Sequence, residues 1–89
     1  MRTLNQCAPG FQAEIKALAA VAKVDPEQVY ALWRKYDARC TNYDQSPVVS
    51  EFIQWYAAEL GGDQLALMQA MQRARNDALT ADLLQVMGA

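Results

Sequence analysis

The side chains with the most recognition chemistry to offer are aromatic and basic rather than catalytic. On a predicted third helix, Val48 and Trp55 lie about 100 to 120° from the centre of the apolar stripe, on its shoulder. On a predicted second helix, Tyr30, Arg34 and Asp37 form one outward strip. Tryptophan, tyrosine and arginine are the residues most often found as interface hot spots. We therefore predict a partner-binding surface made of Tyr30, Arg34, Val48 and Trp55.

Two alternatives stay open for these residues. The polar loop or the last helix would cover an edge tryptophan and make Trp55 part of the core. The outward strip of Tyr30, Arg34 and Asp37 would equally suit a solvated helix face with a weak ion pair. The structure has to decide how far Trp55 and Tyr30 are exposed.

The sequence lacks the residues of a catalytic or metal site. Histidine is absent, which removes the commonest general base and metal ligand, and Cys7 and Cys40 are the only thiols. Two thiolates cannot complete a tetrahedral zinc site, and no CxxC spacing indicates redox work. Gly61-Gly62-Asp63 lacks the Gly-Lys-Ser/Thr of a nucleotide loop. We expect reduced cysteines, no metal, no cofactor and no enzymatic activity.

One segment has the spacing of a known functional motif. Asp25 is a good helix N-cap and Pro26 fits the first helical position, so a second helix is predicted to begin there after a tight turn. From Ile15 to Arg34 the chain resembles the helix-turn-helix. Lys23 stands where that motif usually has glycine, and it would have to adopt a left-handed backbone at a cost of roughly 1 kcal/mol. The matching small and apolar positions are Ala19, Val24, Val29 and Leu32.

The resemblance implies DNA binding, but the charges oppose it. Two carboxylates would lead the recognition helix into a field of phosphates, while Arg34 and Lys35 lie at its far end. The base-facing positions would be Asp25, Pro26, Glu27, Tyr30 and Ala31. The alternative is an ordinary helical corner or hairpin. An antiparallel hairpin would bring Cys7 near Cys40, and a wide corner would separate them.

Helix signals divide the chain clearly. Apolar residues at intervals of three and four predict a first helix over 9–22, and the second should end near Ala38. Ser46-Pro47 predicts the start of a third helix that ends at Gly61-Gly62. Asp63 is expected to cap a fourth helix and Thr80 a short last one.

The predicted core stripes share helical spacing. They are Phe11, Ile15, Leu18, Ala19 and Ala22 on the first helix; Val29, Leu32, Trp33 and Tyr36 on the second; Val49, Phe52, Ile53, Tyr56 and Leu60 on the third; Leu67, Ala70, Met71, Ala74 and Ala78 on the fourth. In the last helix, Leu83, Leu84 and Met87 would suit packing on this core or on a second copy, so a homodimer is one expectation. Met68, Met71 and Met87 suit core filling better than an adaptable groove.

Together these patterns predict an all-α single domain over residues 1–89, a compact bundle of four or five short helices whose first two form a helix-turn-helix-like corner or hairpin. The longest apolar run, 17–22, is far short of a bilayer span, and no apolar signal core follows the first residues, so a cytoplasmic location is expected. The net charge of −2 builds no strong field for nucleic acid. We predict a small acidic regulatory or adaptor protein that binds another protein, of the kind carried by bacterial or phage genomes; the alternative is a helix-turn-helix transcriptional regulator.

Overall fold

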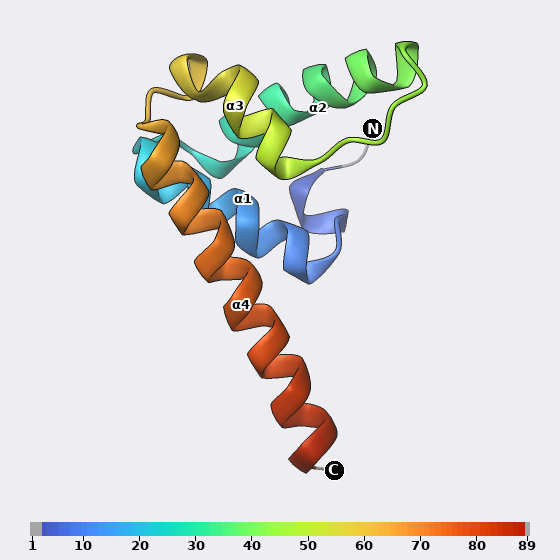
Figure 1. Cartoon of the computed structure of the whole chain (residues 1–89), viewed down its shortest axis with the longest axis vertical. Coiled ribbons are helices and arrows are strands. Elements are labelled where there is room, and N and C mark those ends of the chain that lie inside the picture. The colour runs from blue at the N-terminus through green and yellow to red at the C-terminus, as the bar shows by residue number, and fades with distance from the viewer. Residues whose placement is uncertain (1–2, 89) are drawn as a thin grey trace.

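The computed structural model describes residues 3–88, and the side chains of all of these except 81, 82 and 85–88. A short 3-10 turn, η1 (Leu4–Gln6), precedes four α-helices: α1 (Pro9–Ala22), α2 (Pro26–Asn42), α3 (Val49–Leu60) and α4 (Gln64–Gly88). No strand occurs within residues 3–88, so the predicted all-α class is confirmed. α1 and α2 diverge from their shared turn, and α4 packs along α1 before its C-terminal half projects from the rest (Figure 1).

The turn between α1 and α2 has the left-handed backbone that the resemblance to the helix-turn-helix implied for Lys23. Lys23 adopts the left-handed conformation, with φ 60° and ψ 44°, and its N–H bonds to the Ala19 carbonyl. The N–H of Val24 donates to the same carbonyl at 3.1 Å, which closes the end of α1. A lysine here bears the steric cost that glycine avoids.

The predicted start of α2 at Asp25-Pro26 is confirmed, and a capping box fixes it. The Asp25 carboxylate accepts the Glu27 N–H at 2.9 Å, and the Gln28 side chain accepts the Asp25 N–H at 3.4 Å. The predicted end near Ala38 is wrong, because α2 continues by about another turn to Asn42. The added turn accommodates Thr41, whose hydroxyl donates to the Asp37 carbonyl at 3.0 Å.

The predicted start of α3 at Ser46-Pro47 is also wrong. Val48 is the N-cap, and Val49 is the first helical residue. A tertiary contact explains the shift, since the Val48 N–H donates to the buried hydroxyl of Tyr36 at 3.0 Å. The predicted end is confirmed: Gly61 caps the helix with φ 85°, a left-handed backbone that glycine adopts without steric cost.

α4 is one long helix rather than two short ones. Asp63 caps it by accepting the Ala66 N–H at 3.1 Å, as predicted, but the helix then runs for 25 residues to Gly88. Thr80 lies inside this helix and starts no new one. Leu83 and Leu84 are each more than half exposed, so these two leucines do not pack on the core, which was one of the two expectations for them. Packing on a second copy stays a prediction, and the side chain of Met87 lies outside the described part.

The core forms where the apolar faces of the helices meet. Most predicted core positions are buried, and Tyr36 and Phe52 are its largest fully buried side chains. Met71 is buried and Met68 packs against the core, which fits the predicted filling role. Among the described side chains, the buried apolar residues are Leu4, Ile15, Leu18, Ala19, Val29, Tyr30, Tyr36, Cys40, Val49, Phe52, Ile53, Leu60, Leu67 and Met71.

A single ion pair ties α4 to α1 in the described part of the chain. The Arg75 guanidinium contacts Oε1 of Glu14 through both Nε and Nη2, each at 2.9 Å. Glu14 is buried, so its carboxylate needs this partner to replace lost hydration. The pair adds a polar tie to the apolar packing between α1 and α4.

Candidate protein-binding surfaces

Trp55 is the centre of the first surface. Its side chain is 46 % exposed, so the predicted shoulder position is confirmed and the fully covered alternative is not what the structure adopts. Val48, the extended N-cap residue of α3, is about equally exposed, and its N–H bonds to the hydroxyl of Tyr36, whose ring packs against Trp55. Arg39 and Tyr43 approach from the end of α2 and line a shallow pocket of about 170 Å³ with Trp55. We call Arg39, Tyr43, Val48 and Trp55 the tryptophan patch.

Two contacts hold the Trp55 ring in place. Tyr36 meets it edge to face, with ring centroids 5.7 Å apart and an interplanar angle of 85°. The Arg39 guanidinium carbon lies 5.0 Å from the centroid of the indole, a cation–π arrangement. The indole is thus fixed by the protein while almost half of its surface is open to solvent. No local sequence pattern reveals the Arg39 contact, because the two residues come from different helices.

The hydroxyl of Tyr36 anchors this surface from below. It accepts the Val48 N–H at 3.0 Å and donates to Oε1 of Glu51 at 3.2 Å. Burial raises the pKa of Tyr36 from 10.0 to about 12, because the phenolate would lose its hydration, and the neighbouring Glu51 adds to the rise. The neutral hydroxyl therefore joins α2 to the beginning of α3 and sets the position of Val48.

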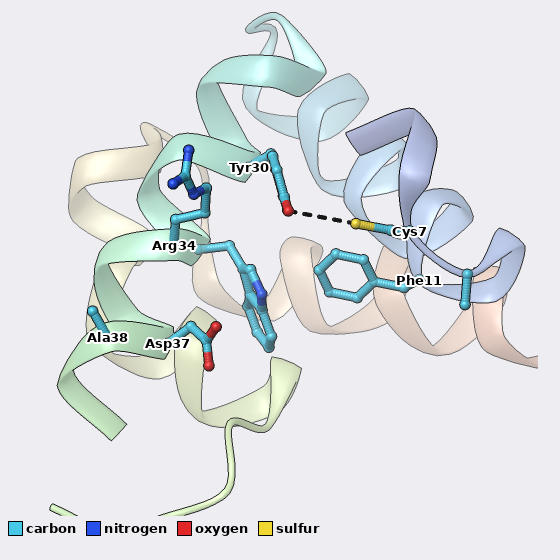
Figure 2. A pocket seen from close by; sticks show the side chains of 8 residues that line it. Cys7, Phe11, Tyr30, Arg34, Asp37 and Ala38 are labelled. Carbon is cyan, nitrogen blue, oxygen red and sulfur yellow. Dashed lines mark hydrogen bonds between the residues drawn. The ribbon is translucent and has the colours of Figure 1, made fainter. Parts of the chain in front are cut away.

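A second surface lies between α2 and the segment that enters α1. It is an open pocket of about 630 Å³, lined by Cys7, Ala8, Phe11, Tyr30, Trp33, Arg34, Asp37 and Ala38 (Figure 2). The rings of Phe11 and Trp33 are 5.0 Å apart between centroids, and both are only partly buried. We call these eight residues the aromatic groove.

The predicted outward position of Tyr30 is wrong. Its side chain is only 7 % exposed. The Phe11 ring packs edge to face against it at 6.3 Å, and the Cys7 thiol donates to its hydroxyl at 3.5 Å (Figure 2). The segment before α1 folds over this face of α2 and covers Tyr30. Helical periodicity on α2 alone does not reveal a cover that comes from elsewhere in the chain.

The four predicted partner-binding residues therefore fall on two surfaces. Val48 and Trp55, which are linked through Tyr36, belong to the tryptophan patch, whereas Tyr30 and Arg34 line the aromatic groove. Sequence reasoning assigned Phe11 and Trp33 to the core and gave Cys7 no site. Their half-buried placement follows from the way η1 and α1 meet α2, which no single helical stripe encodes.

The two cysteines are free, and they lie at different parts of α2, Cys7 beside the helix and Cys40 within it. Cys7 contacts Tyr30, while Cys40 is buried ten residues further along the same helix, a rise of about 15 Å. This separation suits a corner between α1 and α2 better than an antiparallel hairpin.

Neither surface contains a cluster of metal-ligating side chains in the described part of the chain. Among the described residues, no group of three or more His, Cys, Asp or Glu side chains is arranged to hold a metal ion. None of the described helices combines the length and the apolar character needed to cross a membrane. No protein-family model, curated protein or solved structure matches the chain, so its function has to be inferred from these surfaces.

Proposed function

We propose that this protein is a small non-enzymatic regulatory or adaptor protein that acts by binding another protein through the tryptophan patch. The observation that carries the proposal is Trp55, a half-exposed indole held by Tyr36 and Arg39. A ring that is already fixed loses little side-chain entropy on binding. More of the free energy gained by burying it therefore contributes to the affinity. Exposed Tyr43 lines the same pocket and adds apolar area beside it. The cytoplasmic location and the bacterial or phage setting stay predictions.

Replacement of Trp55 by alanine tests the proposal. We expect the substitution to weaken binding by about 2 kcal/mol or more, close to thirtyfold, because hot-spot tryptophans lose at least this much. The partner is first captured from lysate with tagged protein after nuclease treatment, and its affinity is then measured by calorimetry. Gln54→Ala, an exposed neighbour on α3 outside the patch, is the matched control. Unchanged affinity for Trp55→Ala, or its unfolding, would remove the basis for this surface.

DNA binding through the α1–α2 corner is the second candidate. The left-handed backbone at Lys23 supports it, as do the exposed side chains of Arg34 and Lys35. Two features count against it. Tyr30, a base-facing position in this motif, is buried, and exposed carboxylates of Asp25 and Glu27 lead the helix.

The two candidates respond to different substitutions. Changing both Arg34 and Lys35 to glutamate should abolish DNA binding and flatten its salt dependence, since phosphate contacts release counterions. The same pair should leave a complex made through the tryptophan patch within about twofold of the wild-type affinity, because exposed charges outside an interface contribute little. A complex that is captured only without nuclease, and that the double glutamate variant does not form, would support DNA binding in place of protein binding.

A further inference from the structure

The aromatic groove has the form of a binding site that is distinct from the tryptophan patch. One wall is α2, and the other is the segment from Cys7 to Phe11, as Figure 2 shows. Between them lie the partly buried rings of Phe11 and Trp33. The volume of about 630 Å³ exceeds that of one side chain and falls within the range of small ligand sites. The groove therefore has room for an apolar anchor and for the backbone that carries it.

Two unpaired charges flank this apolar floor. Arg34 is exposed and Asp37 is half-buried, three residues and about 4.5 Å of helix rise apart. Within residues 3–88 the structure gives neither side chain an ion pair or a hydrogen bond. Their charged ends point away from each other (Figure 2). An Arg–Asp pair three residues apart on one helix often closes on itself, and this one leaves both charges available to a ligand.

We propose that the aromatic groove binds a segment of a partner protein that presents one bulky apolar side chain between an acidic and a basic residue. The apolar side chain lies against Phe11 and Trp33, the acidic residue faces Arg34, and the basic residue faces Asp37. Rim charges of opposite sign fix the orientation and exclude the reversed segment more than they add affinity. Nucleic acid fits poorly, because the Asp37 carboxylate would repel its phosphates.

The chain supplies its own optical probe for this site. It has two tryptophans, Trp33 in the groove and Trp55 in the patch. A Trp55→Phe protein leaves Trp33 as the only indole, so changes in its fluorescence report on the groove. Random linear peptides displayed on phage are selected against this protein. We expect a consensus in which an aromatic or aliphatic residue stands between an acidic and a basic one, and peptides that change the Trp33 emission.

A charge swap provides the decisive comparison. Arg34→Glu combined with Asp37→Lys keeps the groove but exchanges its rim charges. We expect the selected peptides to bind this variant roughly tenfold more weakly, and a new selection to return the opposite order of acid and base. Arg34→Ala combined with Asp37→Ala is the matched neutral control and should show no order preference. Circular dichroism checks that each variant is folded; if the swap unfolds, Arg34→Gln with Asp37→Asn is used instead, and peptides selected on it should lose the charge order.

Several results would overturn the proposal. Peptides without a charge order, binding that the swap leaves unchanged, or a silent Trp33 would each show that the groove does not select such a segment. Sedimentation of the wild type as a dimer that the swap dissociates would show that a second copy occupies the groove. The proposal does not depend on the tryptophan patch, because every peptide experiment uses the Trp55→Phe protein, while Trp55→Ala tests the patch with the groove intact.

Discussion

Replacing Tyr36 with phenylalanine removes one buried hydroxyl and leaves the ring in place. The hydroxyl accepts the Val48 N–H at 3.0 Å and donates to Glu51 at 3.2 Å. A hydrogen bond to a neutral group contributes about 0.5–1.5 kcal/mol and one to a charged group about 1.5–3. Glu51 and Val48 can recover part of their hydration at the partly open start of α3. We therefore expect a loss of unfolding free energy at the lower end of the sum of these two contributions, about 2 kcal/mol.

The pKa of Tyr36 adds a second, independent signature. Its value rises from 10.0 in the unfolded chain to about 12 in the folded protein. Folding favours the neutral form of this hydroxyl. Its contribution to the free energy of unfolding is therefore complete below pH 10 and is lost as the pH rises toward 12. At pH 11 the wild type should have lost on the order of 1 kcal/mol of unfolding free energy through this titration, a loss that the phenylalanine variant does not undergo. The difference in unfolding free energy between the two proteins should therefore shrink between pH 9 and pH 11.

Urea unfolding followed by circular dichroism measures both effects. With a slope near 1 kcal/mol per molar urea for a chain of this size, the variant midpoint should fall by about 2 M at pH 8. Tyr43→Phe is the matched control, because Tyr43 is 71 % exposed and should shift the midpoint little. A Tyr36→Phe midpoint no lower than that of Tyr43→Phe, or a gap that stays constant up to pH 11, would refute the anchoring role of this hydroxyl.

Three further substitutions test individual elements by the same unfolding assay. Lys23→Gly should raise the unfolding free energy by about 1 kcal/mol by relieving the left-handed backbone, and a loss of stability would contradict that strain. Thr80→Ala should be neutral or stabilising by up to about 0.5 kcal/mol, since Thr80 is inside α4; a loss near 1 kcal/mol would indicate a helix cap. Arg75→Met should cost about 1–2 kcal/mol, because Glu14 stays buried without its partner while Arg75 itself is half exposed. Glu14→Gln with Arg75→Met should recover part of that loss, and no recovery would rule out the charge as its cause.

The elements that the sequence predicts well are those whose ends are set by neighbouring residues. α1, the capping box at Asp25 and the end of α3 at Gly61 each depend on residues within four positions. The errors arise where a distant residue decides the boundary. The start of α3 follows Tyr36, which lies twelve residues from Val48. Thr80 was expected to cap a helix, but the uninterrupted register of α4 allows it an interior position.

The same distinction applies to the candidate surfaces. The angle of Trp55 to the stripe of α3 indicates a shoulder position, but it leaves open whether the loop or the last helix covers the ring, which the structure shows to be half exposed. The aromatic groove does not follow from any helix by itself. It exists because the segment around Cys7 folds onto α2, which buries Tyr30 and leaves the rings of Phe11 and Trp33 partly open. Sequence patterns identify faces, and the crossing of two elements decides which of those faces meet.

The two surfaces are joined by a row of aromatic rings. Phe11, Trp33, Tyr36 and Trp55 follow one another with successive centroid distances of 5.0, 5.3 and 5.7 Å. Coupling between the surfaces would need a second arrangement of the middle of this row. Tyr36 is fully buried and hydrogen-bonded to both Val48 and Glu51, so a different rotamer would break both bonds in a close-packed interior. The row therefore favours one fixed shape for the patch and the groove, and on the two proposals made above their partners would bind independently of each other.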